Sequence, residues 1–225
     1  MHEILSGTRP ILGEAPEDLV SFYQAGELPV FPGSRVYCLE FDAALEYNRA
    51  FSGIEVAARL GLWVLDDAND SNPFAYISKG LCKGMIVHFA HDDEQCIKFA
   101  SLNAFVKALN QLGQCGGDLS ELEGEEIAMP LGPVLEELLE EGSADADFLI
   151  ILYLKAAVGL SPELKSRLAH HEDFLIRESF ADFLVRNPSQ DDLALAEHLA
   201  AESYGQVARP AKVALAAIKR ARYLG

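Results

Sequence analysis

Two short stretches of this 225-residue sequence gather side chains that could do chemistry. The first, DDANDSNP (66–73), holds three aspartates and two asparagines, which are residues that bind calcium in loops. Counted from Asp67, however, Asn72 stands where an EF-hand loop needs glycine, and Ser78 stands where it needs glutamate. Asp and Asn also favour turns, because their side chains bond to the local backbone. The stretch therefore predicts a turn between two strands rather than a metal site.

The second stretch is HFAHDD (88–93), which could hold a metal ion and support a hydrolase. The preceding residues alternate as in a strand, and side chains three apart on a strand, such as His88 and His91, point to opposite faces. We therefore expect a strand followed by a turn. The sequence contains no GxSxG, Walker or HExxH motif, and a helix end explains the adjacent His170 and His171. We predict no catalytic residue, no metal ligand and no cofactor.

The charge of the chain favours a protein partner. It has 18 Lys and Arg against 35 Asp and Glu, a net charge of −17. Such a chain is repelled by phosphate backbones and anionic lipid, so neither nucleic acid nor a membrane is expected as partner. Residues 118–147 contain no basic side chain at all. No secretory signal or membrane span is evident, and the four scattered cysteines favour a reduced, cytoplasmic protein.

The elements that must position these residues divide into two parts, and the first, residues 1–113, reads as an α+β domain. A helix after Pro16, a strand at 35–41 and a helix at 43–60 come first. Ser101 then caps a closing helix after four strand-like runs. Short turn-rich links join these runs, so we expect an antiparallel meander. The runs are LWVLDD (62–67), FAYISK (74–79), MIVHFAH (85–91) and QCIKFAS (95–101).

The second part is all helical. An acidic, Gly-rich linker at 114–132 leads to a helical region at 133–225. The motif DFLI occurs at 147–150 and again at 173–176, and Pro162 and Pro188 repeat at the same spacing, which indicates stacked helical hairpins. This region resembles HEAT-like repeats, although its period is shorter. The expected helices are 133–141, 144–159, 162–170, 173–187, 190–203 and 206–223.

The residues from Pro16 to Leu112 resemble the SUKH superfamily, which includes fungal cell-wall-assembly regulators and many bacterial immunity proteins. The matching pieces are PEDLVSFYQAG, GLWVLDDANDSNPFAYISKG, GMIVHFAHDDE and IKFASLNAFVKAL. The resemblance implies a compact α+β domain without catalytic residues. In bacteria such domains bind and neutralise a toxin, often a nuclease. The helical region departs from this family and leaves open which part holds the partner.

We therefore expect a non-enzymatic protein-binding module, such as an immunity protein that captures a basic toxin. The alternatives are a scaffold that docks a cellular partner through its helical repeats, and a metal-dependent hydrolase built on HFAHDD. Two groups of residues are candidate contacts, chosen by charge and expected exposure, with plain solubility as the competing explanation. They are Asp66, Asp67, Asp70, Asn72 and Tyr76 around the turn, and Glu121, Glu123, Glu125 and Glu126 in the acidic segment.

Overall fold

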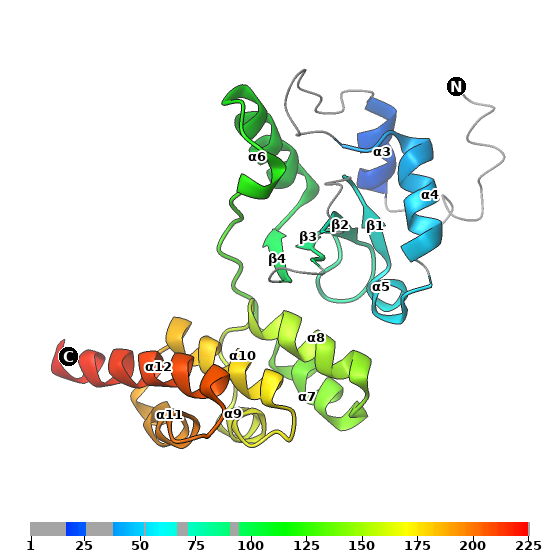
Figure 1. Ribbon diagram of the computed structural model, residues 1–225. Helices are drawn as coiled ribbons and strands as arrows, with labels where there is room; N and C mark the ends of the chain where they lie inside the picture. The colour runs from blue at the N-terminus through cyan, green and yellow to red at the C-terminus, as the bar shows by residue number, and fades with distance from the viewer. Residues whose placement is uncertain (1–16, 26–37, 52, 67–71, 91–94, 225) are drawn as a thin grey trace. The chain divides into compact units, whose positions relative to one another are not determined.

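The chain divides into two compact units, Met1–Glu126 and Ile127–Gly225 (Figure 1). The computed structural model describes residues 17–25, 38–51, 53–66, 72–90 and 95–224. The described part of the first unit contains helices and one antiparallel sheet, and that of the second is helical. The predicted α+β class is therefore confirmed. Within the described residues, no helix combines the length and the apolar character that crossing a membrane requires.

The sheet of the first unit is a meander of four strands that pair in chain order, as predicted. Each strand is antiparallel to the next, with Trp63 opposite Tyr76 and Val87 opposite Ile97. The short turn between the second and third strands needs positive φ at Gly80 (74°), a conformation that glycine adopts without strain. The strands are β1 (Leu62–Val64), β2 (Phe74–Ile77), β3 (Ile86–His88) and β4 (Cys96–Phe99).

Two predictions about the first unit are wrong, namely the strand at 35–41 and the single helix at 43–60. Among the described residues of the expected strand at 35–41, Cys38 to Glu40 form no strand; Leu39 instead donates one backbone hydrogen bond to Leu65 O, at 2.8 Å. The helix expected at 43–60 is two helices, separated at Gly53, a residue that disfavours helix. The helices are α3 (Glu17–Ala25), α4 (Phe41–Phe51), α5 (Glu55–Leu60) and α6 (Leu102–Gln114), followed by the short η1 (Leu119–Glu121).

An aromatic cluster forms the core of the first unit. Phe74 and Phe99 of the sheet pack on Phe105 of α6, with ring centroids 5.4 and 5.5 Å away. Leu19 of α3 joins the same cluster. Ser101 caps α6 as predicted, because its hydroxyl accepts a hydrogen bond from the Ala104 amide at 3.2 Å. Helices α3 and α6 thus share one core with the sheet.

The second unit is a two-layer stack of helices (Figure 1). Helices α7, α9 and α11 are neighbours in one layer, and α8, α10 and α12 are neighbours in the other. The expected helix 144–159 ends early, because Met129 exchanges backbone hydrogen bonds with Ala156 and Val158 and so holds this segment extended. The helices are α7 (Gly132–Glu141), α8 (Ala144–Leu154), α9 (Pro162–Ala169), α10 (Phe174–Arg186), the short η2 (Gln190–Asp192), α11 (Leu193–Ala200) and α12 (Gly205–Leu224).

Two ion pairs join helices of this stack to segments that flank α11. Lys165 of α9 binds both carboxylate oxygens of Asp192, at 3.0 and 2.8 Å. Arg177 of α10 binds both oxygens of Glu202, at 2.7 and 3.0 Å, and its guanidinium lies over the ring of Tyr204. All four charged side chains are largely buried. Charged side chains buried in such pairs are costly to separate.

Candidate protein-binding surface

Of the five candidates around the predicted turn, the three that the structure describes are not exposed. Asp66 and Tyr76 are 0% and 1% exposed, so their predicted exposure is wrong. The Asp66 carboxylate turns inward and accepts a hydrogen bond from the Phe74 amide at 2.5 Å. Tyr76 lies in the core cluster because it follows Phe74 by two residues on β2, and so faces the same side. Asn72 is half-buried, whereas Asp67 and Asp70 lie outside the described residues.

Asp66 also lies close to two buried groups, Cys38 and Tyr23, that hold their protons. Burial raises the pKa of the Cys38 thiol well above its usual range, and the negative charge of Asp66 raises it further. Burial, followed by the charges of Cys38 and Asp66, likewise raises the pKa of Tyr23. At neutral pH both groups remain protonated, and neither supplies a reactive thiolate or phenolate.

The first histidine of the stretch HFAHDD, His88, lies against the core. His88 is the last residue of β3, since Phe89 and Ala90 of the expected run 85–91 form no strand, and its ring centroid lies 4.8 Å from that of Phe74. His91 and the two aspartates that follow it lie outside the described residues. Among the residues that the structure does describe, no group of three or more His, Cys, Asp or Glu side chains could hold a metal ion.

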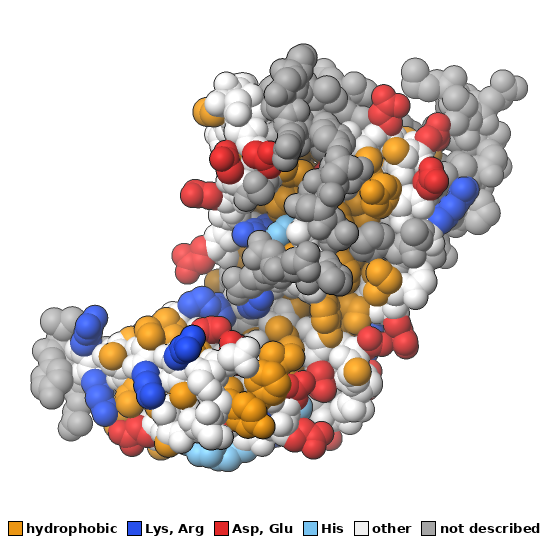
Figure 2. All heavy atoms as spheres, viewed as in Figure 1, with side chains coloured by type: hydrophobic (Ala, Val, Ile, Leu, Met, Phe, Trp, Pro, Cys, Tyr) orange, Lys and Arg blue, Asp and Glu red, His pale blue; other side chains and the backbone are white. Residues whose placement is uncertain are grey.

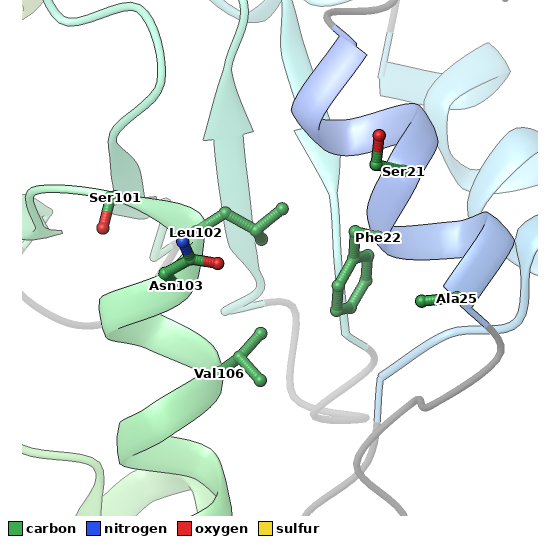
Figure 3. Close-up of a pocket in the computed structure, with 7 residues that line it drawn as sticks. All are labelled: Ser21, Phe22, Ala25, Ser101, Leu102, Asn103 and Val106. Carbon is green, nitrogen blue, oxygen red and sulfur yellow. The ribbon is translucent and has the colours of Figure 1, made fainter.

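A pocket of about 520 Å³ lies between α3 and α6. Figure 3 shows Leu102 and Val106 of α6 pointing toward Phe22 of α3, which gives the pocket an apolar centre. Its polar lining side chains are two serines and an asparagine, and the Ser101 hydroxyl already caps α6. This lining offers shape and a few hydrogen bonds, but no pair of acid and base. The residues are Ser21, Phe22, Ala25, Ser101, Leu102, Asn103 and Val106.

The acidic group of candidates, by contrast, is exposed as predicted. We call these four residues, Glu121, Glu123, Glu125 and Glu126, the acidic edge. The segment that carries them is fixed to the first unit by Leu119 and Leu122, which are 2% and 6% exposed and join the aromatic core. Figure 2 shows acidic side chains on the surface of this unit. The two leucines were not recognised from the sequence, although their spacing of three in a Gly-rich, acidic stretch is a signal for anchoring.

The acidic edge is also bonded to the last strand of the sheet. Glu125 donates its amide to Lys98 O at 2.7 Å, and its carboxylate accepts a hydrogen bond from the Ala100 amide at 3.0 Å. These bonds satisfy backbone groups of β4 and its continuation that an edge strand otherwise leaves open. Glu121 in turn accepts a hydrogen bond from the Asp118 amide at 3.2 Å. The carboxylates of Glu123 and Glu126 stand outward on a backbone that is held in place.

Gly124 permits this close approach, and its replacement by alanine tests it. A Cβ at this position would lie 2.8 Å from Lys98 O and 3.2 Å from Lys98 Cα, and backbone atoms do not yield easily. We expect Gly124→Ala to cost about 1–3 kcal/mol of stability and to expose the Glu125 amide to hydrogen exchange. As control, Gly205→Ala places its Cβ in open space and should leave that exchange unchanged. Unchanged protection of Glu125 in Gly124→Ala would contradict the described contact.

Comparison with known proteins found no matching family model, no matching curated protein and no matching solved structure. Among the described residues of the two groups of candidate contacts, the exposed ones are the four glutamates of the acidic edge.

Proposed function

We propose that this chain is a non-enzymatic protein-binding module that captures a basic protein through the acidic edge. The observation that carries the proposal is that these four glutamates are exposed on a fixed backbone. They are exposed, yet their backbone is fixed by Leu119, Leu122 and the bonds to β4. Plain solubility requires charge, but it does not require charge on a fixed backbone.

A fixed acidic surface favours binding for two physical reasons. Its backbone loses little conformational freedom when a partner docks, so less of the interaction free energy is spent on ordering the chain. The net charge of −17 also steers a basic protein toward the chain and raises the association rate. The second effect depends on charge, so salt should weaken the encounter.

Within this class, the resemblance of residues 16–112 to the SUKH superfamily favours an immunity protein of the cytoplasm. Its partner would be a basic toxin, and a nuclease fits best. A nuclease binds phosphates with positively charged side chains, and a row of carboxylates can occupy that same surface. The helical unit, whose sequence resembles HEAT-like repeats, would then tie the complex to a further protein.

One observation favours the alternative, a scaffold that docks a cellular partner through its helical unit. Helix α12 exposes Arg209, Lys212 and Arg220 on its outer face, and Figure 2 shows basic side chains along it. This face complements an acidic protein rather than a basic one. The two functions therefore differ in which unit holds the partner and in the sign of the partner's charge.

The deciding experiment compares two charge-reversal variants with the same net charge. The first is Glu121→Lys/Glu123→Lys/Glu126→Lys, which spares Glu125 because that residue holds β4. The matched control reverses three exposed glutamates of the helical unit, Glu136, Glu137 and Glu172. Tagged protein captures its partner from source cells at low salt, mass spectrometry identifies that partner, and association rates are then measured with the purified pair.

We expect the edge variant to associate with a basic partner at least about tenfold more slowly than the control variant. The difference between the two association rates should shrink as the salt concentration rises. Equal rates for the two variants would remove the acidic edge as the binding site. Capture of an acidic housekeeping protein, lost when Arg209 and Arg220 are reversed, would establish the scaffold function instead.

A further inference from the structure

Two histidines from different helices of the second unit lie face to face on its surface. His170 caps the C-terminal end of α9, and His198 lies in the last turn of α11. Their ring centroids are 4.4 Å apart, and their planes differ by 22°. Both side chains are exposed. The two residues are brought together by the stacking of neighbouring helix pairs, since 28 positions separate them in the chain.

A hydrogen bond fixes the tautomer of one of these rings. Nδ1 of His170 lies 2.8 Å from the carbonyl oxygen of Ser166, one turn earlier on α9. A carbonyl oxygen only accepts, so Nδ1 carries the proton and donates it. In the neutral ring the lone pair therefore resides on Nε2. Histidines that bind metals have this arrangement, with one ring nitrogen donating to a carbonyl and the other free to coordinate.

We propose that His170 and His198 form a two-histidine site for a divalent transition-metal ion such as Zn²⁺ or Ni²⁺. Imidazole nitrogen suits these ions, and it does not suit Mg²⁺ or Ca²⁺. Two nitrogens bound to one zinc ion at about 2.0–2.1 Å stand about 3–4 Å apart, which rings with centroids 4.4 Å apart can reach. Because the stacked ring planes differ by only 22°, the exposed ring of His198 must turn about its side-chain torsions before both lone pairs meet at one ion. Nε2 of His170 and one ring nitrogen of His198 are the protein ligands.

The rest of the coordination shell is water. Within the described chain, no third His, Cys, Asp or Glu completes a group with these two. A site with two protein ligands and open positions exchanges its ion readily, unlike the closed four-ligand sites that hold structural zinc. The ion would tie α9 to α11, and so one helix pair to the next. Because it binds the folded stack alone, it stabilises that stack by a free energy that rises with the logarithm of the ion concentration once that concentration exceeds the Kd.

The test uses the full chain, Zn²⁺ and Ni²⁺ as probes, and Mg²⁺ as the negative control. Calorimetric titration measures binding, and circular dichroism at 222 nm follows the thermal unfolding of the helices. The variants are His170→Gln and His198→Gln. His171→Gln is the matched control, because His171 is the neighbouring histidine but is not part of the stacked pair.

We expect one equivalent of Ni²⁺ or Zn²⁺ to bind, and a metal concentration about ten times the Kd to raise Tm by about 5 °C or more. His170→Gln and His198→Gln should each weaken binding at least about tenfold and abolish the rise in Tm, which EDTA should also reverse. His171→Gln should retain both the metal binding and the rise in Tm. Absence of binding to the unmodified chain, or unchanged binding in either variant of the pair, would overturn the proposal. Neither result bears on the acidic edge, which lies in the other unit.

Discussion

Replacement of Asp192 by alanine is expected to lower the free energy of unfolding of the helical unit by about 3–5 kcal/mol. Asp192 and Lys165 form a bidentate ion pair whose side chains are 4% and 15% exposed. Removing the carboxylate leaves the ammonium group of Lys165 where water reaches it poorly and no opposite charge balances it. The cost is thus the desolvation of one charge, which far exceeds the worth of a surface ion pair.

The measurement is urea unfolding of the full chain, followed by circular dichroism at 222 nm and by fluorescence. The only tryptophan, Trp63, belongs to β1, so its fluorescence reports the first unit and should not shift. Asp191→Ala, at the exposed neighbouring position, is the control and should change stability by less than about 0.5 kcal/mol. The double variant Lys165→Met/Asp192→Leu removes both charges and should recover most of the loss. A double variant as unstable as Asp192→Ala would refute the explanation by a stranded charge.

The second large effect is expected in the other unit, where Phe105→Ala should cost about 3–5 kcal/mol. The ring of Phe105 is 0% exposed and packs against Phe74 and Phe99. Its removal opens a cavity between α6 and the sheet that the surrounding rings cannot fill. Leu119 and Leu122 belong to the same cluster, so the backbone under the acidic edge should loosen as well.

Trp63 fluorescence during urea unfolding measures this loss, and hydrogen exchange at Glu125 measures the loosening of the edge. Phe105→Leu is the graded control, since it keeps most of the apolar volume and should cost clearly less. A loss below about 1 kcal/mol for Phe105→Ala would show that the cluster is not the core on which this unit depends. A stable fold with full protection at Glu125 would separate the edge from that core.

Most of the elements could be predicted because their signals are local. Alternation marks the strands, and Ser101 marks the start of α6. The repeated DFLI motif marks no common helix start, because Asp173 caps α10 whereas Asp147 lies inside α8, which Ser143 caps. The strand expected at 35–41 was wrong because an apolar segment such as that around Leu39 can be buried beside a sheet without pairing with a strand. The single helix expected at 43–60 was wrong because the helical spacing of apolar residues continues past Gly53, whereas the helical backbone is interrupted there.

The site was predictable only in part. Charge correctly indicated the exposure of the four glutamates, but it failed for Asp66, whose carboxylate is buried to accept the Phe74 amide. Nothing at a carboxylate's own position tells whether its partner is water or a backbone amide eight residues away. The fastening of Glu125 to Lys98 and the meeting of His170 with His198 arise from tertiary packing, which composition and spacing do not encode.

The inward carboxylate of Asp66 has a consequence for how this protein can diverge. Leu65 and Asp66 together bond both backbone groups of Phe74, so the chain is tied at both ends of residues 67–73 by atoms outside that interval. The pairing of β1 with β2 at this point therefore depends on the Asp66 carboxylate, and replacing Asp66 should destabilise the sheet, because the buried Phe74 amide would lose its acceptor. Selection should thus retain Asp66 even when the surface of the protein changes to fit a new partner.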